Sequence, residues 1–539
     1  MKTTRRGFIQ QTTAMVGAGA APWLANLAAI GEASAQSAPG DYKALVCLFM
    51  VGGNDHANTL VPFDQPSNAK YLQYRKDLYY HMSTLKMGDQ ESDIRRPDGG
   101  AWPGAMSTLD QLVLADSSLG ARQFALAPPL TPLKALYDTQ KLAVVLNVGT
   151  LVEPVVGVWD TSIGGVALKK APPSPVPGGY SYQVADLPPR LGSHNDQVSI
   201  WQASNPEGAT VGWGGRTSDE VGAANGKPVF SAVSVSGNTV FLTGTTSVPY
   251  QVTTYNSISI PLDALRIAAY GSAAVSTALG QIVTGTGSTL THMMEQDLTA
   301  ITRRSISTDD VLRGMPLSGN DPLYAPLSTL ADSGNDLAAQ LRTVAHLIRN
   351  RAITGAKRQV FYVQLGGFDN HSALVANHPW LLGRVATAMA AFQQVLEGLP
   401  HPENASNPVG MGGNVTTFTA SDFGRTFNSN GDGTDHGWGG MHFVMGGAVN
   451  GRRIYGKAPV FGDQVKRADG MYYQDTVRGT LIPTTSVDQY AATLARWMGV
   501  PDSKMGTPTF LPNLAKFDAA AGRDPGFNWG RNLGFMKPA

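Results

Sequence analysis

The sequence contains a single cysteine, Cys47, among its 539 residues. One cysteine cannot form an intramolecular disulfide, so a disulfide-stabilised scaffold is excluded. Cys47 lies in the unbroken apolar run 44–51, which has the length of a buried strand. We therefore interpret Cys47 as a buried structural thiol and assign it no chemistry.

Charged residues are also scarce. They make up 15% of the chain and the formal net charge is +1, whereas about 25% is usual for a globular protein. The chain has no basic stripe that could displace counterions from a phosphate backbone, which argues against nucleic-acid binding.

Several standard catalytic motifs are missing. The chain has neither an H-E-x-x-H zinc motif nor a G-x-S-x-G nucleophile elbow. Residues 222–228 resemble a phosphate-binding loop, but the spacing is one residue short and a proline replaces the Ser or Thr, so a turn is predicted. No charged or low-complexity linker divides the chain, and we expect one domain over residues 36–539.

The first 35 residues have the pattern of a twin-arginine export signal. Arg5 and Arg6 precede an alanine-rich apolar stretch, and 33–35 reads Ala-Ser-Ala, a small-residue cleavage site. A membrane anchor is the alternative, but the stretch is only weakly hydrophobic and is interrupted by Pro22 and Asn26. We predict export by the twin-arginine machinery to the periplasm or the exterior, without a stable membrane anchor.

Apolar runs and helical periodicity alternate along the mature chain, which favours an α/β fold with a mostly parallel central sheet flanked by helices. Within it, residues 206–320 are rich in Ser, Thr, Gly and Val, and segments 229–235 and 239–242 alternate in polarity. We predict a β-rich insertion or cap there. The expected strands are 44–51, 142–148, 359–365 and 415–419, and the expected helices include 128–137, 337–348, 382–396 and one opened by a capping box of Ser486 and Gln489.

Acidic and histidine side chains follow three of these strands, each after a glycine or in a glycine-rich loop. Parallel strands place their carboxyl ends at one edge of a sheet, so these side chains are expected to converge on a metal or anion site. Carboxylate and imidazole ligands suit zinc, manganese, magnesium or calcium. Taken singly, each cluster also fits turn or N-cap chemistry. The candidate metal ligands are Asp55, Asp369, His371, Asp422, Asp435, His436 and His442.

Residues 193–197 follow a long loop and begin a predicted helix. Ser193 would lie at the helix N-terminus, where free amides favour an anion and activate a hydroxyl, although a plain N-cap is an equal alternative. Ser193 and the adjacent His194 are the candidate catalytic residues. Arg190 and Arg425 could hold an anionic group in a bidentate manner.

Eight ordered motifs span the mature chain: 49–62, 71–75, 129–133, 193–197, 212–216, 367–371, 421–426 and 433–437. With them the chain resembles the bacterial family catalogued as domain of unknown function 1501, whose members usually carry twin-arginine signals. That family in turn resembles the alkaline phosphatase, sulfatase and phosphoglycerate mutase superfamily, whose members bind two metals at strand ends.

The superfamily resemblance implies roles for individual residues. Asp55 would bind one metal, Ser193 would attack the substrate, and Asp369 with His371 would bind the other metal. Asp422 matches the acid of a late Asp-His pair, but Phe423 stands where the histidine belongs. His436 or His442 would then supply the missing ligand, or one metal would be lost.

These observations predict an exported, metal-dependent hydrolase of a phosphate or sulfate ester, with Ser193 or a metal-bound water as the nucleophile. A formylglycine sulfatase is disfavoured, because no C/S-x-P-x-R motif surrounds Ser193. The alternative is a secreted binding or assembly protein that kept the scaffold without the chemistry, which would be consistent with Phe423.

Overall fold

The computed structural model describes residues 42–83, 109–172, 180–254, 272–286, 292–315, 321–402, 404, 409–467, 470–518 and 530–538. The predicted export signal, 1–35, lies outside these ranges. Within them, no helix has the length and apolar character needed to cross a membrane.

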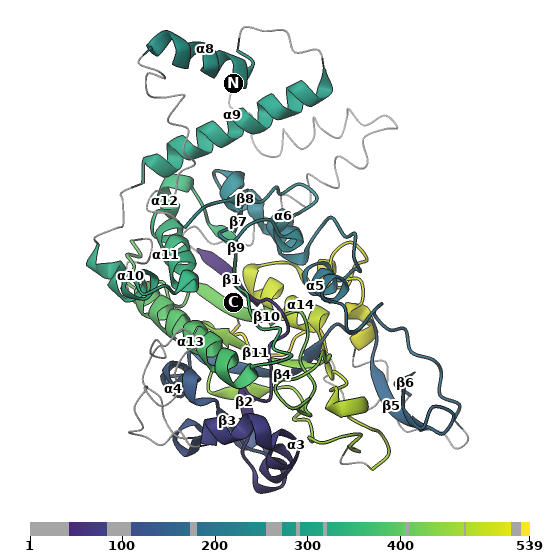
Figure 1. Cartoon of the computed structure of the whole chain (residues 1–539). Coiled ribbons are helices and arrows are strands. Elements are labelled where there is room, and N and C mark those ends of the chain that lie inside the picture. Colours follow the sequence, from purple (N-terminus) through teal and green to yellow (C-terminus); the bar gives the residue numbers. More distant parts are fainter. Residues whose placement is uncertain are drawn as a thin grey trace.

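A nine-stranded sheet lies at the centre of the molecule, in the order β12-β4-β11-β10-β1-β9-β7-β8 with β13 beside β4 (Figure 1). β11 pairs antiparallel with both β10 and β4, and every other pairing in this sheet is parallel. All of its strands except β11 therefore run in the same direction, which confirms the predicted mostly parallel sheet. The strands are β1 (Lys43–Met50), β4 (Leu142–Gly149), β7 (Ala232–Ser234), β8 (Tyr250–Gln251), β9 (Arg358–Leu365), β10 (Val415–Ser421), β11 (Gly440–Met445), β12 (Arg453–Tyr455) and β13 (Thr485–Ser486).

The four predicted strands are confirmed as β1, β4, β9 and β10. Their sequences are continuously apolar or β-branched because both faces of the sheet are covered. Along β1 the side chains alternate between two separate cores, with Val46 and Leu48 in one and Cys47 and Phe49 in the other. Cys47 is buried and free, and burial raises the pKa of its thiol, as expected of a structural cysteine.

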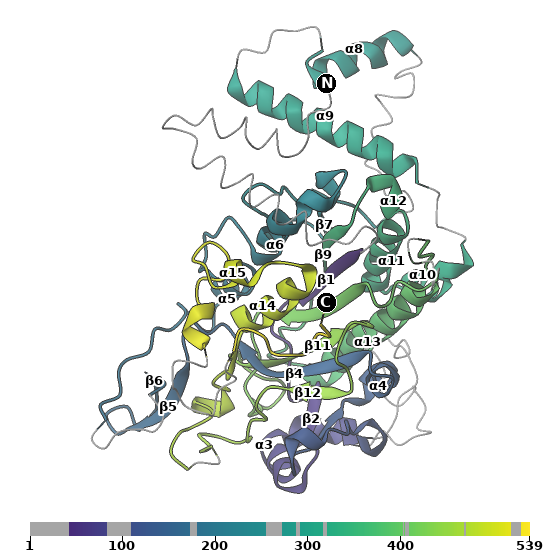
Figure 2. The same ribbon diagram turned by 180° about the vertical axis from the view of Figure 1, so that it is seen from behind.

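Helices cover the two faces of the sheet (Figures 1 and 2). The predicted helices 128–137, 337–348 and 382–396 are confirmed, and the capping box of Ser486 and Gln489 opens the last long helix as expected. One face carries α4 (Thr131–Asp138), α10 (Ala325–Asp332), α11 (Asp336–Arg349) and α13 (Leu374–Gly398), and the other carries α5 (His194–Ala203), α6 (Trp213–Val221) and α14 (Val487–Met498).

The prediction of a β-rich insertion over 206–320 is wrong for the part that the structure describes. This part is mainly helical, with α6, α8 (Ala273–Thr284) and α9 (Met293–Arg313), while β7 and β8 extend the central sheet rather than forming a hairpin. Residues 240–242 form a 3₁₀ turn. Ser, Thr and Val suit short connections as well as strands, so composition alone was misleading. α8 and α9 project at one end of the molecule (Figure 2).

The remaining elements decorate the sheet. A hairpin of two strands stands apart from it, and short strands near the first helix pair with each other. These elements are β2 (Leu60–Pro62), β3 (Phe124–Leu126), β5 (Val155–Asp160), β6 (Gly165–Lys170), α3 (Gln65–Ser83), α12 (Arg351–Thr354) and α15 (Asp502–Met505).

Candidate metal centre

The carboxyl ends of β1, β9 and β10 lie level with one another at one edge of the sheet. Met50 of β1 is in register with Leu365 of β9 and Ser421 of β10. The loops that follow these strands therefore begin at the same height. This register brings the residues after Met50, Leu365 and Ser421 together, as the sequence predicted.

His194 joins this edge from the first turn of α5. Its Nδ1 lies 2.6 Å from Oδ2 of the buried Asp422. A carboxylate can only accept, so Nδ1 carries the proton and Nε2 carries the lone pair. That Nε2 lies 3.4 Å from Oδ2 of Asp369. The hydrogen bond that His194 donates to Asp422 raises the pKa of His194 against the effect of burial.

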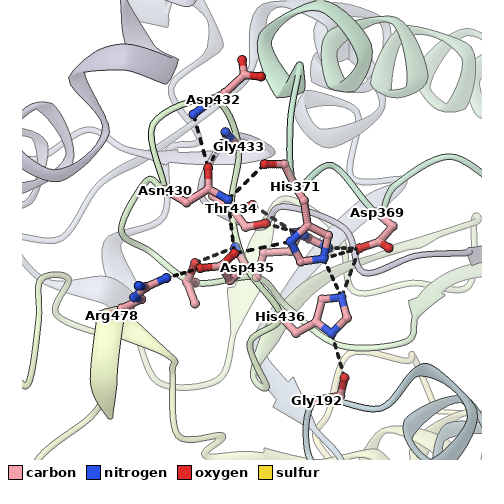
Figure 3. Close-up of polar contacts among 12 residues, drawn as sticks. Gly192, Asp369, His371, Asn430, Asp432, Gly433, Thr434, Asp435, His436 and Arg478 are labelled. Atoms are coloured by element: carbon pink, nitrogen blue, oxygen red, sulfur yellow. Dashed lines mark hydrogen bonds and ion pairs between the residues drawn. The ribbon is translucent and has the colours of Figure 1, made fainter.

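His371 and His436 approach the same carboxylate from the loops after β9 and β10 (Figure 3). Each places Nε2 3.2 Å from Oδ1 of Asp369, and the two Nε2 atoms are 2.9 Å apart. The other ring nitrogens face acceptors, with His436 Nδ1 2.7 Å from the carbonyl oxygen of Gly192 and His371 Nδ1 3.4 Å from Oδ1 of Asp435. The acceptor at each Nδ1 therefore fixes the orientation of both imidazole rings, with Nε2 directed at Asp369.

The tautomers that these contacts impose leave an electrostatic problem. The carbonyl of Gly192 and the carboxylate of Asp435 cannot donate, so the neutral forms of His436 and His371 both carry Nε2 lone pairs. Those two lone pairs face each other and the carboxylate of Asp369. A cation, either a proton or a metal, is needed among them. Burial lowers the pKa of His436, and its bond to Gly192 only partly offsets this, which disfavours a proton on this ring.

The arrangement fits a metal ion. His194, Asp369 and His436 offer ligand atoms that all lie within 4.8 Å of one another. Tetrahedral ligands about 2.0–2.1 Å from a metal lie roughly 3.3–3.4 Å apart, close to the separations of 3.2 and 3.4 Å that join Asp369 to His436 and to His194. Metal-binding histidines also typically donate their other ring N–H to a carboxylate or a carbonyl. The donors are rich in imidazole nitrogen, which favours zinc over magnesium or calcium.

Arg425 fixes the position of the Asp369 carboxylate. Its side chain is fully buried and its Nη1 donates to Oδ1 of Asp369 at 2.7 Å and to the carbonyl of Gly52 at 3.1 Å. Nε and Nη2 bind Thr434. Burial alone would raise the pKa of Asp369, but the Arg425 hydrogen bond and charge, then His194 and His371, lower it. Arg425 was predicted to hold an anionic group of the substrate. In the structure it is buried and binds Asp369 instead.

Phe423, which stands where the superfamily resemblance would place a histidine, is buried within the cluster. Its ring centroid lies 4.9 Å from that of His194 and 4.6 Å from that of His436. It also packs so closely on Gly53 that a Cβ on this glycine would lie 2.5 Å from the phenyl ring. The phenyl ring of Phe423 thus forms an apolar surface against which the imidazoles of His194 and His436 pack.

Asp55 does not face the cluster, contrary to the role that the superfamily resemblance implied. Its Oδ2 forms a buried ion pair with Arg75 and accepts from Thr434 Oγ1 at 3.1 Å. Its Oδ1 accepts from the backbone N–H groups of Ala57 and Asn58. Burial raises the pKa of Asp55, but Arg75 and neighbouring groups lower it well below the usual range. All of its lone pairs are directed at partners other than a metal.

His442 is a core residue rather than a ligand in this structure. It lies within β11, which is covered on both faces, and packs 4.8 Å from the ring of Trp201. Burial lowers the pKa of His442 to about 3, so its imidazole is neutral. Its Nδ1 lies 3.5 Å from Oγ1 of Thr419. The pattern of a histidine after glycines was misleading, because the glycines here lead into a strand.

Three further predicted residues lie at the margin. Ser193 is the N-cap of α5, where Oγ accepts from the N–H of Asp196 at 3.5 Å, and no side-chain base contacts it among the described residues. Arg190 is 73% exposed and faces Asp196 and Glu207. Asp435 bonds Arg478 at 2.5 Å as well as His371.

Sequence reasoning missed the partners that orient the site. Gly192, Thr434, Arg75 and Arg478 each supply a contact described above, and His194 was taken as catalytic rather than as a ligand candidate. Arg75 could have been noticed, since it ends the motif 71–75. The contact of the Gly192 carbonyl could not be predicted from the sequence, because every residue has a backbone carbonyl.

Comparison with known families bears on this region. Residues 287–507 match the model of a family described as protein of unknown function (DUF1501). The match supports the resemblance to that family over the segment that carries Asp369, His371, Asp422, Asp435 and His436. No curated protein matches the chain.

Proposed function

We propose that this protein is an exported, metal-dependent hydrolase of a phosphate or sulfate ester. The observation that carries the proposal is the convergence of three imidazole Nε2 atoms on Asp369, with every Nδ1 facing an acceptor. His194, Asp369 and His436 would hold a single divalent ion, with His371 beside it. When bound there, the ion would act as a Lewis acid on the ester and lower the pKa of a coordinated water.

The residues of the chain have separate tasks in this proposal. Asp422 and the carbonyl of Gly192 hold the rings of His194 and His436 so that Nε2 points inward. Arg425 keeps Asp369 in one position. Such orienting partners are commonly worth a factor of about 10 to 100 in metal affinity or activity.

His371 is the most suitable residue to move a proton. Its side chain is 45% exposed, and its Nδ1 faces Asp435, which can stabilise the imidazolium. Ser193 is less suited to the attack, since its hydroxyl caps α5 and contacts no side-chain base in the part of the chain that the structure describes. We therefore favour water over Ser193 as the nucleophile, with the alcohol of the ester as the leaving group.

The proposal is tested with purified mature protein, stripped of metal and then supplied with zinc or manganese. We expect hydrolysis of 4-nitrophenyl phosphate or 4-nitrophenyl sulfate only after metal is added. Asp369→Ala should lose both the metal and the activity. Asp186→Ala, which changes a carboxylate outside the cluster, is the matched control. Equal turnover by metal-free and metal-loaded protein would contradict the proposal.

A second function is favoured by one observation. Phe423 fills the space beside two imidazoles with an apolar ring, and the chain has no second set of ligands converging nearby among the described residues. A secreted protein that binds metal or a partner without turnover fits this. Stoichiometric metal without hydrolysis of either ester would support that alternative.

A further inference from the structure

A cavity of about 590 Å³ opens directly beside the metal centre. His194, Asp369 and Asp422 form one part of its wall. Other parts come from later residues of α5, from the loop 207–209 and from Val240 of the 3₁₀ turn at 240–242. Volumes of roughly 300–1,000 Å³ are typical of small-molecule sites, so the cavity can hold more than the reacting group.

The cavity wall is mainly apolar and carries no cation besides the site histidine. Val51, Val198, Ala209 and Val240 supply apolar surface. Among the described residues that line the cavity there is no lysine or arginine, whereas Glu207 adds a carboxylate at the mouth. A negatively charged group moved into this space would lose hydration without gaining a lysine or arginine as counter-charge, which is costly.

A buried amide also lines this cavity. Gln202 is 7% exposed and lines the cavity. Its Oε1 accepts from the backbone N–H of Phe241 and from Thr239 Oγ1, both at 3.1 Å. A backbone N–H can only donate, so the assignment of oxygen and nitrogen in this amide is fixed. Nε2 then donates to no residue that the structure describes.

We propose that this cavity binds the alcohol part of the substrate, and that this alcohol is uncharged, largely apolar and carries a hydrogen-bond acceptor for Gln202 Nε2. The link to catalysis rests on the proposed hydrolase function. The binding preference itself depends only on the cavity. Gln202 is the specificity-determining residue, because its amide is the buried side-chain donor among the described residues that line the cavity.

Calorimetry with three alcohols of similar size tests the preference. 4-(Hydroxymethyl)acetophenone offers a neutral acceptor, 4-ethylbenzyl alcohol offers none, and 4-(hydroxymethyl)benzoate carries a charge. We expect the ketone to bind about three- to tenfold more tightly than the ethyl compound, the usual worth of one net hydrogen bond. The carboxylate should bind at least about tenfold more weakly than the ketone.

Gln202→Glu is the decisive variant, because it keeps an oxygen for Phe241 and Thr239 and removes the two donors. It should abolish the preference for the ketone over the ethyl compound while leaving the metal content unchanged. Gln251→Glu, an exposed change on β8, is the control. Ala209→Trp should fill the cavity and weaken all three alcohols. Binding that does not distinguish ketone from carboxylate, or a Gln202→Glu protein with an unchanged preference, would overturn the inference.

The same experiment separates this inference from the proposed hydrolase. Binding is measured with metal-free protein and with Asp369→Ala, neither of which is expected to turn over an ester. Selective binding without any hydrolysis would reject the hydrolase and retain the cavity. Hydrolysis with no selectivity among esters of the three alcohols would reject the cavity and retain the hydrolase.

Discussion

Replacing Asp55 by asparagine separates a structural role from a metal-binding role for this carboxylate. Asp55 and Arg75 are 1% and 0% exposed, so the substitution leaves a buried guanidinium without its counter-charge. Removing one partner of a buried ion pair typically costs about 3–5 kcal/mol. Because Thr434 Oγ1 also donates to Asp55, the asparagine retains part of the hydrogen bonding, and the lower end of that range is expected.

The assay is denaturant or thermal unfolding combined with metal analysis of the same preparation. Asp55→Asn should unfold markedly more easily and still bind metal as the wild type does. Asp138→Asn is the control, since the exposed pair of Lys134 and Asp138 should contribute less than about 1 kcal/mol. A variant of unchanged stability that has lost its metal would refute the reasoning and restore Asp55 as a ligand.

Three further predictions concern the residue that positions Asp369 and the titration of two buried groups. Arg425→Lys removes the fork that holds Asp369, and its metal dissociation constant, measured by chelator competition, should rise about ten- to hundredfold. Burial lowers the pKa of His346 to about 4, so the folded state stays neutral where the unfolded chain binds a proton. Stability is thus lost as pH falls from about 6.5 towards 4. In His346→Gln, the free energy of unfolding should change with pH over this range less steeply than in the wild type, by up to about 1.4 kcal/mol per pH unit. Burial raises the pKa of Asp475 to about 7, so stability is lost as pH rises from about 4 to 7. Asp475→Asn should gain about 1–3 kcal/mol at pH 8 and nothing at pH 4; an equal effect at both pH values would contradict this.

The central strands could be predicted because burial on both faces leaves an unbroken apolar run. β1, β4, β9 and β10 all show this pattern. β11 escaped prediction, since His442 interrupts its apolar sequence and the strand runs against its neighbours. Its direction depends on pairings that no local pattern encodes.

The place of the site could be predicted, but not the pairing of its side chains. The glycines and acids after three strands indicate the shared edge, and register then brings Asp369 and Asp422 together. Which carboxylate meets a buried arginine and which meets an imidazole is decided by distant residues. Asp55 meets Arg75 from α3, whereas Asp422 meets His194 from α5.

Phe423 shows the same limit. In the sequence, Phe423 stands where the superfamily resemblance predicts a histidine ligand. In the structure its ring packs against His194 and His436. Two imidazoles from other elements thus stand around the position where one was expected, which a comparison of aligned motifs does not reveal.

Metal content tests the central claim most directly. Mature protein, exported and purified without added chelator, should contain about one equivalent of zinc or manganese by elemental analysis. His194→Ala and Asp369→Ala should lose the metal, while His442→Phe, which changes a core residue, should retain it. Protein that carries no metal and gains none from a zinc or manganese solution, or an Asp369→Ala variant with the full complement, would contradict the account.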